Sequence, residues 1–217
     1  MQWLAFSLCV GCIVTSTVNA ESTASARIYS SLSAASDYRY NGVSFSDRSS
    51  VLQASVHLWR PDGFYAGVFV TGVDFDDPSN TSYEVDLYAG RNLKLDHGEL
   101  TLEALYTAFP EKDFPGPTYD FLQMKARFRR NLRDDIFSGV TLTWTPQASY
   151  GTGEAWRLAA EASLKLAPWL TLTTNAGRRW IETGSDRSYW DIGFTAANDR
   201  MSFDLRYVDT NLSAENC

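Results

Sequence analysis

The sequence predicts an all-β protein, an antiparallel up-and-down transmembrane β-barrel of about 12 strands, of which about 11 are present in this chain. Three observations carry this prediction. Polar and apolar residues alternate with a period of two in about eleven segments, the segments are about ten to thirteen residues long, and the connections are by turns short and long. Such segments, with short turns at one edge and longer loops at the other, are typical of outer-membrane barrels.

Residues 1–20 have the pattern of a signal peptide that precedes a barrel domain at 21–217. They carry no charged side chain, stay apolar as far as Val14 and end in Val18-Asn19-Ala20, a small-residue cleavage pattern. The segment lacks the usual Lys or Arg near its start, so a buried or membrane-anchoring helix and a lipoprotein modified at Cys12 remain alternatives. We expect export to the cell outer membrane and a mature chain that starts near Glu21.

The charge and the cysteine content limit which partners and which covalent links we expect. All 26 acidic and 19 basic residues follow residue 20, so the mature chain carries a formal charge of −7. Counterion release needs clustered Lys and Arg, and we therefore expect no nucleic acid partner. Cys9 and Cys12 lie in the leader and Cys217 is the last residue, which leaves no pair of cysteines for an internal disulfide in the mature chain.

Segment 154–166 shows both the strand signal and its ambiguity. Trp156 and Leu158 share one parity with other apolar residues, while Arg157 and Glu161 share the other. The charged residues would also form a stripe along one side of a helix, so this segment alone does not decide between a strand and a helix. Helical spacing would mix the two sets in four other alternating segments, 100–108, 122–129, 190–196 and 201–207. We therefore interpret all five segments as strands with one apolar face.

The same pattern, taken along the chain, predicts strands at 27–37, 51–60, 63–75, 82–93, 99–109, 118–130, 135–145, 154–166, 169–181, 187–197 and 201–208. Tight turns are predicted at 61–62, 94–98, 131–134, 167–168 and 198–200. The intervening connections are longer and rich in Gly, Pro, Asp and Ser, at 41–50, 76–81, 110–117, 146–153 and 182–186.

Strand length favours a membrane setting. These strands exceed the five or six residues usual in soluble sheets and suit a tilted crossing of a bilayer, which makes a soluble sandwich the weaker alternative. Aromatic residues near the strand ends predict girdles at both membrane interfaces. They are Trp59, Phe64, Tyr106, Phe109, Trp144, Trp156, Trp169, Trp180 and Tyr189.

Four separated motifs resemble the TorF family of proteobacterial porins: SDYRYNGVSFSD at 36–47, GFYAGV at 63–68, EVDLYAG at 84–90 and YVDTNL at 207–212. The resemblance runs through most of the mature chain. It implies an outer-membrane barrel with a poorly defined pore function and no set of catalytic residues. Family members continue into a last strand that ends in an aromatic residue, whereas this sequence stops at Cys217. Since single-chain barrels normally have an even number of strands, we expect the C-terminal strand to be absent here.

If the apolar residues face lipid, the alternate charged residues line the lumen: Glu84, Asp86, Glu103, Lys125, Arg127, Arg129, Arg157, Glu161, Lys165, Asp191, Asp204 and Arg206. We expect the acidic residues of segments 82–93 and 99–109 to pair with the basic ladder of Lys125, Arg127 and Arg129. Each pair is worth about 0.2 to 1 kcal/mol where water reaches it.

A narrow charged lumen suits passive diffusion of small polar solutes, with the ladder favouring small anions. Expected partners are outer-membrane lipid and lipopolysaccharide, the barrel-assembly machinery and small polar solutes. A closed barrel that is structural, or that binds a partner through its loops, is the alternative. Barrel size does not decide between an open channel and a closed barrel, because a barrel of twelve strands lies between filled barrels of eight strands and open channels of sixteen.

Motifs that carry chemistry are sparse. His57 and His97 are the two histidines, and no Gly-x-Ser-x-Gly elbow or other nucleophile motif accompanies them, so a membrane-barrel enzyme is the weakest alternative. Asp74, Asp76 and Asp77 resemble a calcium cluster only loosely. We expect no catalytic residues, no cofactor and no metal ligands.

Overall fold

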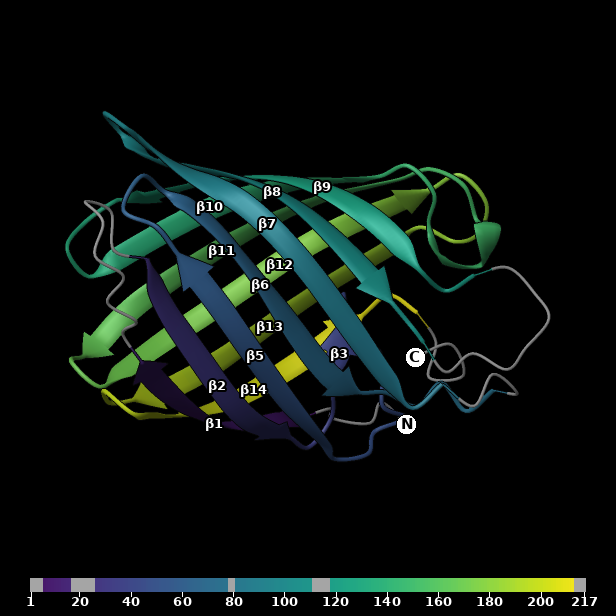
Figure 1. The fold of residues 1–217 in the computed structure, drawn as a ribbon, viewed down its shortest axis with the longest axis horizontal. Coiled ribbons are helices and arrows are strands. Elements are labelled where there is room, and N and C mark those ends of the chain that lie inside the picture. The colour runs from purple at the N-terminus through teal and green to yellow at the C-terminus, as the bar shows by residue number, and fades with distance from the viewer. Residues whose placement is uncertain (1–5, 17–25, 78–80, 111–117, 213–217) are drawn as a thin grey trace.

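Eleven long strands form one antiparallel sheet in the computed structural model, which describes residues 6–16, 26–77, 81–110 and 118–212 (Figure 1). From β2 to β14, each long strand pairs with the next long strand along the chain. In the described ranges no helix has the length and apolar character that a membrane span requires. The predicted all-β, antiparallel fold class is confirmed.

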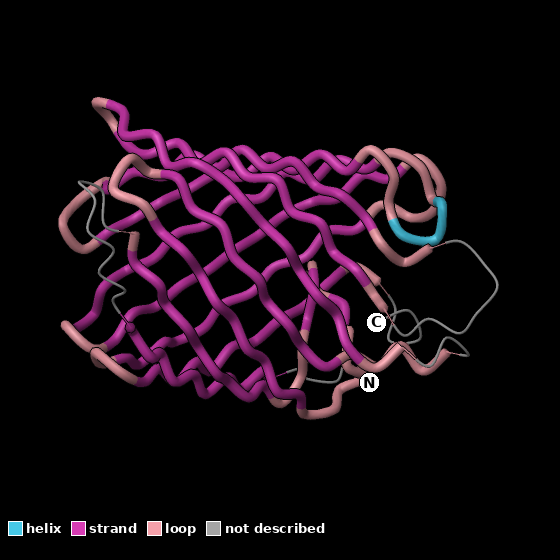
Figure 2. Tube along the Cα trace, in the orientation of Figure 1, coloured by secondary structure: helices cyan, strands magenta, loops and turns pink. Residues whose placement is uncertain are grey.

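The strands of this sheet are β2 (Arg27–Ala35), β5 (Val51–Trp59), β6 (Phe64–Gly72), β7 (Tyr83–Leu95), β8 (Gly98–Ala108), β9 (Phe121–Asn131), β10 (Ile136–Thr145), β11 (Ala155–Ala167), β12 (Leu170–Ile181), β13 (Arg187–Ala197) and β14 (Met201–Thr210). All eleven predicted strands are present, with each end within three residues of its predicted position. The short turns lie at one end of the sheet, and the longer connections lie at the other, with a 3-10 turn at Ser149–Gly151 (Figure 2).

A further strand, β1 (Phe6–Ser16), comes from the predicted signal peptide. It pairs with both edges of the sheet, since Phe6 lies opposite Tyr207 of β14 and Ser16 lies opposite Ile28 of β2. With β1 included, the strand order has no free edge, as in a closed barrel. The eleven-stranded sheet by itself is open between β2 and β14. Strand β1 thus fills the place where the odd strand count predicted a missing strand.

The two faces of the sheet differ in polarity. Along β5, residues alternate between partly buried and exposed, and the exposed set includes Leu52 at 69% and Val56 at 47%. Large apolar side chains are exposed on the same outer face of other strands, among them Leu87, Leu102, Phe128, Val140, Leu158, Ile192 and Leu205. Contiguous apolar surface of this kind marks contact with a partner or a membrane.

The aromatic residues near the strand ends divide between the two faces. Trp156 and Trp180 are exposed on the outer face. Phe109 and Tyr189 are only 4% and 5% exposed, so their predicted place in an outer girdle is wrong. Phe109 follows the end of β8 and packs against Tyr119 in an apolar cluster at the loop end, and Tyr189 shares the inner parity of β13.

The role of β1 at the edges yields a prediction. A chain that starts at Glu21 should exchange the amide hydrogens of β2 and β14 faster than the full chain, because removal of β1 leaves both edges without backbone partners. Hydrogen exchange followed by mass spectrometry measures this difference, with β9 and β10 as internal references. Equal protection of both edge strands in the two chains would contradict the prediction.

Candidate functional site

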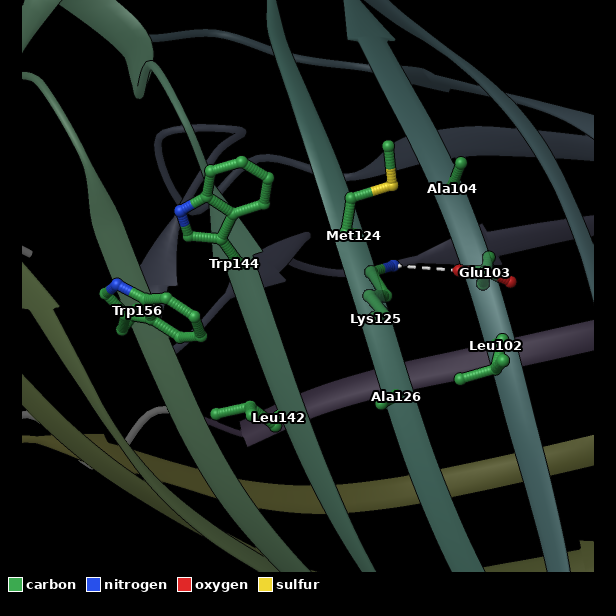
Figure 3. Close-up of a pocket in the computed structure, with 9 residues that line it drawn as sticks. All are labelled: Leu102, Glu103, Ala104, Met124, Lys125, Ala126, Leu142, Trp144 and Trp156. Carbon is green, nitrogen blue, oxygen red and sulfur yellow. Dashed lines mark hydrogen bonds and ion pairs between the residues drawn. The ribbon is translucent and has the colours of Figure 1, made fainter.

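The predicted lumen residues lie on the inner face, where most of them gather in three ion-pair groups. The first group joins Glu103 of β8 to Lys125 of β9, with 3.1 Å between Oε1 and Nζ, as predicted for neighbouring strands (Figure 3). The Tyr65 hydroxyl donates a hydrogen bond to the other oxygen of Glu103 at 2.8 Å. Leu102 and Met124, which precede these two residues in sequence, are exposed on the outer face.

The second group places two arginines around one carboxylate. Glu161 of β11 lies 2.7 Å from Arg127 and 3.3 Å from Arg129, both on β9. The intervening strand β10 carries Gly139 at this level, and a Cβ there would stand 2.5 Å from Glu161 Oε1. The glycine therefore leaves the space through which the carboxylate reaches across β10. Arg129 also stacks 4.1 Å from the ring centroid of Phe137.

The third group lies on β13 and β14. Arg206 forms ion pairs with Asp191 and with Asp204, the latter at 3.1 Å. Asn175 donates to Asp191 at 3.2 Å, and the Thr195 hydroxyl donates to Asp204 at 2.6 Å. These carboxylates have partners on three neighbouring strands, β12, β13 and β14, so the group links these strands on the inner face.

The predicted pairing is wrong for the acidic residues of β7. Glu84 and Asp86 face inward, but Glu84 accepts a hydrogen bond from the Tyr38 hydroxyl at 2.8 Å, and Asp86 accepts one from Thr107. In the strand register, Asp86 lies level with Thr107, four residues from the level of Lys125. Lys165 is exposed near the short-turn end of β11, where the pairing with β12 shifts register.

A short hairpin folds into the interior from the connection that follows β2. It consists of β3 (Arg39–Tyr40) and β4 (Val43–Ser44), within the first motif of the porin resemblance. The Tyr40 hydroxyl accepts a hydrogen bond from Gln123 of β9 at 2.8 Å, and Arg157 of β11 donates to Asn41 at 3.4 Å. Since β9 and β11 stand opposite β2 in the strand order, the hairpin crosses the interior from one wall to the other.

The turn of the hairpin explains its sequence. Asn41 and Gly42 have φ angles of 51° and 86°, the left-handed conformation that Asn-Gly adopts in tight hairpins. A Cβ at Gly42 would lie 2.9 Å from the Cβ of Thr210 and 3.0 Å from that of Tyr189, so only glycine fits against β13 and β14. The sequence predicted this region as part of a long loop, and the inward fold was not foreseen.

The base of the hairpin is held by buried polar groups. Asp37 accepts hydrogen bonds from Arg39 and from Ser44, and the fully buried Ser46 hydroxyl donates to the Ser49 carbonyl at 2.9 Å. Burial, together with the neighbouring Glu84 carboxylate, raises the pKa of Tyr38 well above its ordinary value. Tyr38 therefore stays protonated as a donor and ties the hairpin to β7.

Two cavities lie along the interior. A polar cavity of about 460 Å³ contains members of all three ion-pair groups, together with Arg157. A second cavity of about 480 Å³, at the loop end, is lined by aromatic rings and by Arg179 and Arg187. The lumen residues predicted from the sequence did not include these two arginines, although each occupies an inner position of its strand. The alternation of Arg179 with the exposed Arg178 and Trp180 was a signal that could have identified the first.

The two histidines occupy different settings. His57 faces the interior, as its parity suggested, and stacks on Tyr65 and Tyr88 with centroid distances of 5.4 Å and 5.9 Å. His97 is exposed in the turn between β7 and β8. Within the described part of the chain, no group of three or more His, Cys, Asp or Glu residues could hold a metal ion. Asp77, from the loosely calcium-like set, accepts hydrogen bonds from Tyr119 and Tyr150.

Comparison with known proteins gives a match to a protein family. The sequence pattern of one family, described as "Bacterial protein of unknown function (Gcw_chp)", matches residues 19–216. A search of curated proteins gives no match.

The passage of Glu161 across Gly139 can be tested. Gly139→Ala should displace the carboxylate from Arg127, because the new methyl group occupies its path. Two partly buried guanidinium groups then lose their carboxylate, which should lower the free energy of unfolding by about 1–3 kcal/mol. Urea unfolding in detergent micelles measures this, with Ser138→Ala on the same strand as control.

A double-mutant cycle tests the cause. If Gly139→Ala acts through Glu161, it should add little in a Glu161→Gln background, since the interaction is already lost there. Additive effects of the two substitutions would mean that the glycine serves the backbone of β10 instead.

Proposed function

The chain belongs to the family of bacterial proteins of unknown function described as Gcw_chp, and we propose that it is an outer-membrane β-barrel through which small polar solutes diffuse. The observation that carries the proposal is the division of one long-stranded sheet into an apolar exterior and a charged interior. The four motifs that resemble TorF-family porins agree with it. The inward hairpin narrows the passage.

The exterior supports a lipid setting. Outward side chains such as Leu32, Leu87 and Phe194 are 59%, 53% and 48% exposed, and similar residues follow on nearly every strand. At about 25 cal/mol per Å² of apolar surface, exposing such a face to water is costly, whereas a bilayer removes the cost. The strands of nine to thirteen residues also suit a tilted crossing of the bilayer.

The leader supports export. Residues 1–18 lie outside the matched family region, which begins two residues before the predicted mature start. If the leader is cleaved, β1 is lost, and a closed barrel requires another strand between β14 and β2. The pairing of β1 with both edges supports the idea that one strand is enough to fill this gap.

The interior supports a narrow, anion-favouring passage. Arg127 and Arg129 share the single carboxylate of Glu161, so this group keeps a net positive charge. Arg157 adds another guanidinium whose hydrogen-bond partners are the neutral groups of Asn41, Tyr189 and Thr143. Positive charge in a confined aqueous passage raises the local concentration of anions.

A closed structural barrel is the second candidate, and one observation favours it. Side-chain hydrogen bonds tie the hairpin to three strands: Tyr38 donates to β7, Tyr40 accepts from β9 and Asn41 accepts from β11. A hairpin held at three walls resembles a fixed plug as much as a constriction. Electrical conductance separates the two candidates.

Replacing residues 38–45 by a Gly/Ser segment of equal length should raise single-channel conductance several-fold, because it removes the polar bridge across the interior. The measurement uses the full chain refolded into planar bilayers, with heat-modifiable gel mobility to establish folding. Discrete conductance from the native chain supports the pore. Silence of the folded native chain, with conductance from the variant, would support the plugged scaffold.

The lipid-facing surface yields a separate prediction. Ile192→Arg should lower the free energy of unfolding in lipid vesicles by about 2–4 kcal/mol, because Ile192 lies on the outer face near the middle of β13. The matched control is Thr195→Arg, which places the same charge on the inner face beside Asp204 and should cost far less. Equal losses from the two substitutions would argue against a bilayer around this sheet.

A further inference from the structure

Three arginines form a row across neighbouring strands near the loop end. Arg157 of β11 lies directly opposite Arg179 of β12, which lies directly opposite Arg187 of β13. All three occupy inner positions and are partly buried. Like charges directly opposite one another destabilise a sheet unless a counter-charge lies between them. The row therefore needs an explanation.

Arg157 and Arg179 have no carboxylate partner among the described residues. Arg157 donates hydrogen bonds to Thr143 at 2.9 Å, to Tyr189 at 3.1 Å and to Asn41 at 3.4 Å, all of which are neutral acceptors. The other interior groups contrast with this, because each contains at least one carboxylate.

Two buried donors at the same place lack acceptors. Arg157 Nε and Asn41 Nδ2 are both buried without a hydrogen-bond partner. A buried donor without an acceptor costs about 1–3 kcal/mol, and such groups in native structures call for a specific cause. An anion bound beside the arginine row would supply counter-charge next to these two donors.

The cavity beside the row is aromatic. Arg179 and Arg187 line the loop-end cavity of about 480 Å³, whose wall includes Phe45, Phe75, Phe109 and Phe121. The rings pack edge to face, with centroid distances of 5.3 Å for Phe45 and Phe75 and 5.5 Å for Phe75 and Phe109. Asp77 also lines the cavity, but its carboxylate accepts hydrogen bonds from two tyrosine hydroxyls. Ligand sites of this size typically combine an apolar wall with a few convergent polar groups.

We propose that this cavity is a binding site for aromatic carboxylates. The carboxylate lies against Arg179 and Arg187, which line the cavity, because guanidinium groups bind carboxylates through paired hydrogen bonds. Arg157 lies directly opposite Arg179 in the row and adds positive charge behind the site. The ring lies against the phenylalanine wall, where aromatic groups pack favourably. The inward hairpin takes part through Tyr40 and Phe45, which contribute to the cavity wall. Binding does not require an open pore, so the proposal goes beyond the transport function.

The wild-type test uses the full chain refolded in detergent micelles, at low ionic strength, with calorimetric titration of trans-cinnamate. Two analogues separate the parts of the site: cinnamyl alcohol keeps the ring and lacks the charge, and acetate keeps the carboxylate and lacks the ring. We expect each analogue to bind at least tenfold more weakly than cinnamate. Equal binding of either analogue, or tighter binding of inorganic phosphate, would overturn the proposal.

Variants then assign the binding to the row. Arg179→Gln should weaken cinnamate binding at least tenfold, and Arg179→Lys should lie between, because lysine keeps the charge and loses the planar fork. The control is Arg133→Gln, which removes one charge from an exposed turn at the opposite end of the sheet and should leave binding unchanged. Equal weakening by Arg133→Gln and Arg179→Gln would reduce the effect to net charge and overturn the assignment. Heat-modifiable gel mobility establishes the folding of each variant. Because the experiment measures binding and not conductance, the binding proposal can hold for a closed barrel as well as for an open pore.

Discussion

Continuous backbone pairing from β2 to β14 is the constraint on which the rest of the structure depends. Once strands pair on both sides, successive side chains must point to opposite faces of the sheet. A slip of one residue in any strand would exchange its faces and move Glu161 outward while Leu158 turned inward. The apolar exterior and the charged interior are therefore two consequences of one register. Neither could be altered without the other.

The charged interior in turn requires local devices that satisfy it. Glu161 reaches two arginines only because Gly139 leaves the intervening strand bare. The hairpin acts in the same way at the loop end, where Tyr38 donates to Glu84 and Asn41 accepts from Arg157. It supplies further hydrogen-bond partners to inward groups of the wall strands. The hairpin thus occupies part of the interior and adds hydrogen-bond partners to some of its polar groups.

The sequence predicted what is local and missed what depends on register. Period two is a property of each segment alone, so all eleven strands could be located before any pairing was known. Which residues stand at one level depends on the stagger between strands, and for that reason Glu84 and Asp86 were paired wrongly with the basic ladder. The row that contains Arg179 was invisible for the same reason. The hairpin was missed because strands of two residues leave no periodic signal.

Charge is distributed unevenly along the interior, and the direction of this asymmetry has physical consequences. Toward the short turns, Lys125, Arg127 and Arg206 each have a carboxylate partner. At the loop end, Arg157 and Arg179 have none among the described residues, and Arg157 contacts the hairpin through Asn41. An anion that enters from the loop end would meet uncompensated positive charge beside an aromatic wall before it reached the compensated pairs. If the proposed passage conducts, selection would therefore act at the loop end, beside the proposed carboxylate site, and the ion pairs nearer the short turns would serve mainly to hold neighbouring strands together.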